Sequence, residues 1–409
     1  MRKGFACLIA LIQDALMKTR RFGRTEIEMP VFSVGGMRYQ HKWQDIPLSD
    51  VPKECQDNLE NIVHRALELG LNHLETARGY GSSEIQLGRV LQEIPRESYI
   101  LQTKVVPSSP QEFLETFELS LKTLGLEYVD LLSVHGINLP EHLECTLKPG
   151  GPIDILHQMQ KDGRIRHMGF STHGNTSLIL EAIRTGAFDY LNLHYYYINQ
   201  FNWPAIEAAS KQDMGVFIIS PTDKGGMLYK PSPILSQLCQ PLHPIEFNDL
   251  FCLSHPEIHT LSLGAAKPSD FDLHVQSLEY YENIETIMNP IKERLDQRQR
   301  DTLGSGWFDN WHKDLPQWFE NPGHYNIIEL LRLYNLVKSF DMIDFGKYRY
   351  NLMGYADHWM PGASLENLNQ DQIKKAISSS CFRDQIPEMI DFLRTHLHEK
   401  PAKRLSESS

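Results

Sequence analysis

Residues 70–88 of the chain read GLNHLETARGYGSSEIQLG. An apolar strand pattern around Leu71 and Leu74 leads directly into a polar turn that carries Glu75 and Tyr80. An amphipathic helical pattern precedes this stretch at 58–69 and places its Leu, Ile, Val and Ala residues on one stripe. The stretch therefore predicts one β–α repeat whose strand ends beside residues that can carry chemistry.

The same alternation extends from residue 30 to about residue 280. Its short runs are largely apolar on both alternating faces, which is typical of strands covered inside and outside. Strands are expected at 31–35, 71–76, 98–105, 129–135, 165–171, 190–195, 215–220 and 259–263. Eight β–α repeats of this size predict an α/β fold of the (β/α)8 TIM-barrel type. An open doubly wound sheet is the alternative, but no GxGxxG motif follows the first strand.

Three regions are expected along the chain. Residues 1–16 form an N-terminal extension outside the core, with Met17 as the expected start; residues 17–280 form the barrel; residues 281–409 form a mainly helical C-terminal appendage. Residues 18–30 predict a hairpin ahead of the first barrel strand, with Gly23 near its turn.

Composition excludes several classes of function. A formal net charge of −12 argues against a nucleic-acid surface and against adhesion to anionic lipid. No segment approaches the roughly 18 apolar residues of a membrane-spanning helix. The six cysteines are scattered without a CxxC pair, so neither a structural metal site nor an iron–sulfur cluster is expected. We expect a cytoplasmic protein without nucleic-acid or membrane partners.

Three consecutive strand ends carry reactive side chains. The second strand leads into Glu75 and Tyr80, the third ends near Lys104, and the fourth ends on His135. In a TIM barrel the carboxyl ends of the strands line one face, where active sites lie. The strand assignment alone therefore brings these four side chains together.

These residue types suit the reduction of a carbonyl group. Hydride addition requires a proton donor at the oxygen, where negative charge develops. The pKa of a free tyrosine is about 10, and a neighbouring ammonium lowers it. Lys104 would act in this way on Tyr80, Glu75 would hold Lys104, and His135 would orient the carbonyl. Each residue alone is more often a surface ion pair or a core residue, but the four together favour a site.

The chain resembles the aldo-keto reductase family from about residue 17 to about residue 280. The resemblance rests on three segments in order: residues 70–88, residues 120–135 (SLKTLGLEYVDLLSVH) and residues 163–171 (GRIRHMGFS). It implies NADP(H)-dependent reduction of a small aldehyde or ketone. It also implies an Asp/Tyr/Lys/His tetrad, which maps onto Glu75, Tyr80, Lys104 and His135.

Glu75 departs from the family pattern, which usually has Asp at this place. The charge is kept, but the added methylene moves the carboxylate or forces another rotamer, and such sites depend on about half an ångström. We expect chemistry that is retained but retuned. The alternative is a barrel that binds cofactor with weak or no turnover and has a regulatory or binding role.

The resemblance also assigns a cofactor site, for NADPH or alternatively NADH. TIM barrels often bind phosphate through the loops after strands seven and eight, which read SPTDKGGML at 220–228 and GAAKPSD at 264–270. The residues expected to bind cofactor are Gly36, Ser171, Thr172, Ser220, Lys224, Gly226, Leu228, Lys267 and Ser269. Ile219 stands where the family commonly has an aromatic residue, and Phe271 or Asp272 where many NADPH-dependent members have arginine.

The C-terminal region has a second resemblance. Residues 380–390 (SCFRDQIPEMI) are similar to the ferredoxin-like region of some aldo-keto reductases. Only Cys381 stands in that segment, so no [4Fe–4S] cluster is expected. The aromatic stretch at 348–362 is interpreted as core packing of the appendage.

Overall fold

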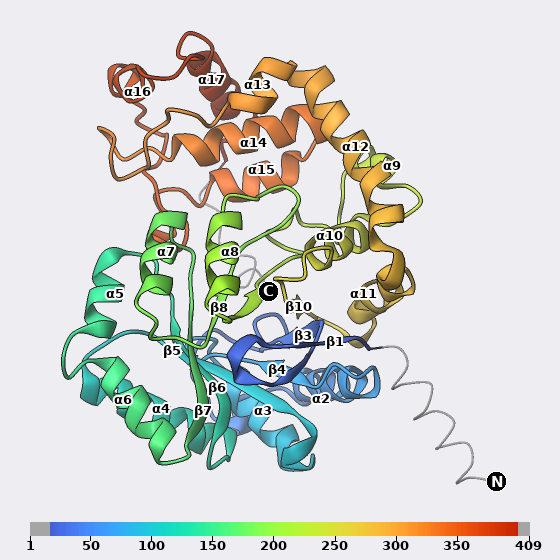
Figure 1. Cartoon of the computed structure of the whole chain (residues 1–409), viewed down its shortest axis with the longest axis vertical. Helices are drawn as coiled ribbons and strands as arrows, with labels where there is room; N and C mark the ends of the chain where they lie inside the picture. The colour runs from blue at the N-terminus through green and yellow to red at the C-terminus, as the bar shows by residue number, and fades with distance from the viewer. Residues whose placement is uncertain (1–16, 400–409) are drawn as a thin grey trace. The chain divides into compact units, whose positions relative to one another are not determined.

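The computed structural model describes residues 17–399, so the expected extension at 1–16 lies outside the described residues. Within the described range the core is a closed barrel of eight parallel strands with helices outside it (Figure 1). The order around the barrel is β10-β3-β4-β5-β6-β7-β8-β9. Pairing of β10 with β3, with Leu261 opposite Phe32, closes the ring. The predicted TIM barrel is confirmed, and an open doubly wound sheet is excluded.

The barrel strands are β3 (Phe32–Gly35), β4 (His73–Glu75), β5 (Ile100–Val105), β6 (Val129–His135), β7 (Ile165–Ser171), β8 (Tyr190–Leu193), β9 (Gly215–Ile218) and β10 (Thr260–Gly264). Helices that follow them are α2 (Lys53–Glu68), α3 (Ser83–Leu91), α4 (Pro110–Leu124), α5 (Pro140–Leu147), α6 (Pro152–Lys161), α7 (Thr176–Arg184), α8 (Trp203–Lys211), α10 (Pro244–Leu253) and α11 (Asp272–Ser277). Helix α4 shows which residues set the ends of such a helix. Ser109 caps its first turn and Pro110 occupies that turn, while Gly125 ends the helix in the left-handed region at φ +68°.

A hairpin closes the amino end of the barrel. Strands β1 (Thr19–Arg21) and β2 (Glu28–Pro30) pair antiparallel, as predicted. Phe22, between them, is fully buried and packs in a cluster with Tyr190 and Phe217 at the barrel interior. A Cβ at Gly215 would lie 2.6 Å from the Phe22 ring, so glycine is required there. Apolar contacts therefore seal this end.

A polar layer crosses the middle of the barrel. His73 Nδ1 lies 2.7 Å from Ser33 Oγ, which in turn lies 2.6 Å from Thr260 Oγ1. Gln102 Nε2 donates to Ser133 Oγ at 2.8 Å. All five side chains are fully buried. Side chains point into the barrel at every second residue of a strand. In β4, β5 and β6, the residue two positions after each member of this polar layer therefore also points inward, one layer closer to the carboxyl end.

The described chain divides into two compact units. The first contains the barrel and ends at Ile284, and the second consists of Gly226–Phe247 with the chain from Glu285 onward. The domain bounds expected from the sequence, 17–280 and 281–409, stay a prediction. None of the helices in residues 17–399 is both long enough and apolar enough to cross a membrane.

The second unit is mainly helical. Its helices are α9 (Pro233–Cys239), α12 (Ile284–Leu303), α13 (Ser305–Asn310), α14 (Ile327–Phe340), α15 (Ile343–Tyr350), α16 (Gln370–Ala376) and α17 (Ile386–Leu397). Helix α14 is largely buried and packs against α15 and α17. Burial alone would raise the pKa of Glu329 on α14, but Arg332 at 2.6 Å and Arg349 at 3.2 Å lower it to about 2.

We predict that His73 makes the barrel sensitive to acid. Burial lowers the pKa of His73 to about 3, against about 6.5 in an unfolded chain. Between these values the unfolded chain binds the extra proton, so the free energy of unfolding falls as pH falls, by roughly 4–5 kcal/mol over the whole window. Urea unfolding at several pH values from 7 to 4 should give a shallower slope for His73→Gln than for the exposed control His157→Gln. Equal slopes would contradict the prediction.

Candidate active site

Three neighbouring strands carry the predicted side chains to one layer of the barrel. Glu75 ends β4, Lys104 is the next-to-last residue of β5, and His135 ends β6. Each stands two residues beyond a member of the buried polar layer, namely His73, Gln102 and Ser133. The period of two along a strand therefore directs all three side chains to the same inner face at the carboxyl end.

Lys104 is the centre of the contacts in this layer. Its side chain is buried and its Nζ forms an ion pair with Glu75 Oε1. The same nitrogen donates to the carbonyl oxygen of Thr76 at 3.0 Å and to the hydroxyl of Tyr80 at 3.3 Å. Burial lowers the pKa of the Lys104 ammonium well below its usual value, and the Glu75 carboxylate opposes that shift.

The longer carboxylate of Glu75 is accommodated by its neighbours. Its second oxygen, Oε2, accepts a hydrogen bond from Ser262 Oγ of β10 at 3.0 Å. A Cβ at Gly35 would lie 2.6 Å from that hydroxyl and 3.3 Å from Glu75 Oε2. Glycine at position 35 and serine at position 262 therefore make room for glutamate and fix its rotamer.

Tyr80 lies on the loop between β4 and α3. Because its hydroxyl oxygen accepts from Lys104, the phenolic proton points elsewhere. The Tyr80 ring meets the rings of His135 and Trp43 edge to face, with centroids 5.6 Å and 6.0 Å away. The Tyr80 hydroxyl is thus bound by the Lys104 ammonium, while the Tyr80 ring contacts the His135 imidazole and the Trp43 ring.

Buried charge holds the Tyr80 loop in place. Glu84 is fully buried, and burial raises its pKa, although Thr103 and Arg78 donate to its two oxygens, each at 2.7 Å. Arg78 also forms an ion pair with Asp45, on the loop after β3. Gly81, at φ +53°, lets the two loops touch, because a Cβ there would overlap the backbone of residues 42 and 43.

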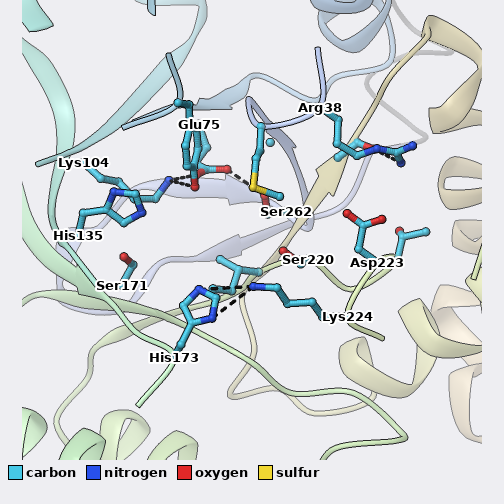
Figure 2. Close-up of a pocket in the computed structure, with 16 residues that line it drawn as sticks. Arg38, Glu75, Lys104, His135, Ser171, His173, Ser220, Asp223, Lys224 and Ser262 are labelled. Carbon is cyan, nitrogen blue, oxygen red and sulfur yellow. Dashed lines mark hydrogen bonds and ion pairs between the residues drawn. The ribbon is translucent and has the colours of Figure 1, made fainter. Parts of the chain in front are cut away.

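These side chains line a pocket at the carboxyl ends of the strands (Figure 2). Glu75, Tyr80, Lys104 and His135 all contribute to its wall. The remaining lining residues are Gly35, Met37, Arg38, Ser171, His173, Ile219, Ser220, Thr222, Asp223, Lys224, Ser262 and Gly264. The four residues predicted to be catalytic are therefore brought together, and their roles stay a prediction.

The residues predicted to bind cofactor are only partly gathered at this pocket. Ser171, Ser220 and Lys224 line it. Thr172 uses its hydroxyl to donate to Ile137 O at 2.6 Å. Gly36 is buried under backbone, since a Cβ there would lie 2.6 Å from Glu75 O.

The other four predicted cofactor residues are not among those that line the pocket. Lys267 and Ser269 are exposed around η4 (Pro268–Phe271). Gly226 and Leu228 belong to the second unit. Their contribution to binding stays a prediction.

The donor set in the pocket fits a nicotinamide dinucleotide. Ser171 and Ser220 offer hydroxyls suited to an amide or a sugar, and Arg38 and Lys224 offer charge suited to phosphate. Gly264 leaves space beside the pocket, because a Cβ there would lie 3.0 Å from Arg38 Cδ. Among residues 17–399 no cluster of histidine, cysteine or acidic residues is arranged to hold a metal ion.

Several lining residues were missed by the sequence reasoning. His173 directly follows Ser171 and Thr172, so its place after the fifth strand could have identified it. Arg38 lies in a loop without a pattern of its own, and Asp223 lies in the 220–228 loop, where only its neighbours were predicted to bind cofactor. Trp43 comes beside Tyr80 only because the Arg78 and Gly81 contacts join two loops.

Comparison with known proteins identifies one matching family and several distant relatives. The model of the Aldo/keto reductase family matches residues 32–236, which is half of the 409-residue chain. The NADH-specific methylglyoxal reductase of Escherichia coli (strain K12) is 24% identical over 157 residues, covering 33% of this chain and 47% of that protein. The L-glyceraldehyde 3-phosphate reductase of the same strain is 25% identical over 187 residues, covering 41% and 49%. This chain spans less than half the length of either relative.

A solved structure shares the fold. The aldo-keto reductase AKR11C1 from Bacillus halodurans, in a holo form, superimposes with a TM-score of 0.57 at 21% identity and covers 68% of this chain and 96% of that one. At this identity the likeness concerns the barrel only. The family model ends at residue 236, so the ferredoxin-like resemblance of residues 380–390 stays a prediction.

We predict that Lys104 and Glu75 stabilise the barrel only as a pair. Glu75→Leu or Lys104→Met leaves a buried charge uncompensated and should cost about 3–5 kcal/mol, whereas the double variant should cost clearly less than the sum. Because the folded state lowers the pKa of Lys104, the unfolded chain binds more protons, and Glu75→Leu should regain stability as pH rises from 7 to 9. Urea unfolding measures both effects. Lys53→Met, which removes an exposed pair with Asp57, is the control, and additive single costs would refute the coupling.

Proposed function

This chain belongs to the aldo/keto reductase family, and on that basis we propose that it reduces an aldehyde or ketone to the alcohol with NADPH, Tyr80 donating the proton. The observation that carries the proposal is the position of Lys104 Nζ, between the Glu75 carboxylate and the Tyr80 hydroxyl at 3.3 Å, at the wall of a pocket. Proton donation to a carbonyl oxygen needs this combination of a phenol and a fixed cation.

Each residue of the tetrad has a separate task in this mechanism. Tyr80 directs its proton away from Lys104 and can transfer it to an oxygen in the pocket. Lys104 stabilises the phenolate that remains, because an ammonium at hydrogen-bond distance favours the charged form of a phenol. Glu75 pairs with Lys104 and favours its charged form against the effect of burial. His135, in edge contact with Tyr80, directs the carbonyl oxygen toward the hydroxyl.

The cofactor supplies the hydride when it is bound. Ser171, Ser220 and Lys224 are the pocket residues that would hold it, and Lys267 with Ser269 would meet its adenosine phosphate. NADH is the alternative: Phe271 is buried and Asp272 pairs with Arg65 at 3.4 Å, so neither supplies the usual arginine, and one relative is NADH-specific. Both relatives reduce small carbonyl compounds by their names, which supports the substrate class.

A binding or regulatory role without turnover is the second candidate. Ile219, in place of the common aromatic residue, lines the pocket beside Ser220 and favours it. The contacts of Glu75 with Lys104 and Ser262 favour an enzyme. Tight NADPH binding without consumption across a broad panel of aldehydes and ketones would establish the second candidate.

We predict that Tyr80→Phe lowers kcat about 10²–10⁴-fold, because it removes the proton donor and leaves the ring in place. NADPH affinity, measured by fluorescence titration, should change less than about threefold, since the hydroxyl serves catalysis rather than cofactor binding. Turnover is measured as NADPH consumption with the best aldehyde of the panel. Tyr355→Phe, at an exposed position, is the matched control. Undiminished turnover in Tyr80→Phe would remove Tyr80 from the mechanism.

A further inference from the structure

The Glu75 carboxylate lies between two partners that come from different strands (Figure 2). Its oxygen Oε1 forms the ion pair with Lys104 of β5. Its other oxygen, Oε2, accepts a hydrogen bond from Ser262 Oγ of β10 at 3.0 Å. All three residues are buried. Each oxygen of this buried carboxylate is therefore bound by a different side chain.

The hydrogen bond between Ser262 and Glu75 reaches across a strand. Strand β3 lies between β4 and β10, and Gly35 is paired with Glu75 on one side and with Gly264 on the other. A Cβ at Gly35 would lie 2.6 Å from Ser262 Oγ and 3.3 Å from Glu75 Oε2, so glycine leaves this path open. An aspartate at position 75 is shorter by one carbon–carbon bond, about 1.5 Å. It could therefore keep only one of the two partners at hydrogen-bond distance.

The donors of Lys104 match the acceptors around it. An ammonium has three N–H donors. Lys104 Nζ contacts Glu75 Oε1, the carbonyl oxygen of Thr76 at 3.0 Å and the Tyr80 hydroxyl at 3.3 Å. The contact with Tyr80 is the longest of the three and is made to a neutral group, so it is easily lost. A second charged acceptor beside Nζ would therefore displace Tyr80 first.

We propose that Ser262 is a positioning residue that keeps the Lys104 ammonium available to Tyr80. By donating to Glu75 Oε2, Ser262 restricts the carboxylate to a single contact with Lys104. Without that hydroxyl, Oε2 is a buried charged oxygen that lacks its donor, and it turns to Lys104, because a carboxylate competes for an ammonium better than a phenol does. Lys104 then moves away from Tyr80. The inference rests on the proposed function only for its effect on turnover.

Withdrawal of Lys104 changes Tyr80 in a defined direction. An ammonium favours the phenolate, so its withdrawal raises the pH at which Tyr80 loses its proton. Activity that needs the protonated phenol is then lost at a higher pH, while kcat at neutral pH falls because the phenolate left after proton transfer is less stable. The other charged and titratable groups of the pocket wall and of the Tyr80 loop are Arg38, Asp45, Arg78, Glu84, His135, His173, Asp223 and Lys224. Ser262→Ala changes the charge of none of them.

The titration of Tyr80 tests the inference without cofactor or substrate. The full chain is labelled with tyrosine that carries ¹³C at Cζ, and the NMR signal of Tyr80 is assigned by its loss in Tyr80→Phe. Ser262→Ala should raise the titration midpoint of Tyr80 by about 0.5–1 pH unit. The matched control is Ser33→Ala, which removes a buried hydroxyl from the residue paired with Ser262 in β3 and should leave the midpoint in place. An unchanged or lowered midpoint in Ser262→Ala would refute the positioning role.

A second variant tests whether Ser262 acts through Glu75. Glu75→Asp keeps the charge but cannot serve both partners, so the Tyr80 midpoint should rise in this variant too. Adding Ser262→Ala to Glu75→Asp should then raise it no further. An equal rise in both backgrounds would mean that Ser262 acts on Tyr80 without Glu75, and would overturn the proposal. If Ser262→Ala does not fold, Glu75→Asp decides alone, and an unchanged midpoint in it counts against the proposal.

Turnover gives a separate measurement. With NADPH and the best aldehyde of the panel, Ser262→Ala should lower kcat about tenfold, change KM less than about threefold, and move the alkaline loss of activity to higher pH. A raised KM with unchanged kcat and an unchanged Tyr80 midpoint would make Ser262 a substrate contact and refute the positioning role. If the unaltered protein consumes no NADPH with any carbonyl compound, the proposed function fails, and the Tyr80 titration still decides the role of Ser262.

Discussion

A buried ammonium in the interior of a barrel is tolerated only when every direction around it supplies an acceptor. Lys104 meets this condition through the Glu75 carboxylate, the Thr76 carbonyl and the Tyr80 hydroxyl. Glu75 is held in turn by Ser262 from β10. Strands β4, β5 and β10 must therefore keep their register together. A shift of one residue in β5 would turn Lys104 to the opposite face and leave Glu75 buried without its partner.

This constraint explains which parts of the site the sequence could predict. Apolar runs in the sequence predict the strands. Once the strands are known, the alternation of side chains along each strand places Glu75, Lys104 and His135 in one layer. The room that Gly35 leaves for the Glu75 carboxylate depends on β3 lying between β4 and β10. These strands come together only in the closed barrel. The difference in length between Glu and Asp therefore could not show from the sequence that the barrel has room for the longer side chain.

Two adjacent hydroxyl residues also show what the sequence alone could not predict. Ser171 and Thr172 are adjacent and similar in chemistry, and both were predicted to face cofactor. Ser171 lines the pocket, whereas the Thr172 hydroxyl donates a hydrogen bond to the Ile137 carbonyl oxygen. The partner of a hydroxyl is a property of the folded loop. The pattern of residue types therefore indicated a loop that lies at the pocket, without deciding which of its side chains faces the cavity.

The Phe22 hairpin has a consequence for how such a protein changes over time. It seals one end of the barrel with apolar packing that requires glycine at position 215, while the groups capable of chemistry gather at the other end. A substitution in the seal therefore changes the packing inside the barrel, whereas one in the carboxyl-end loops changes the wall of the pocket. Because the two ends share no residues, the effects of substitutions at one end and at the other should be nearly additive.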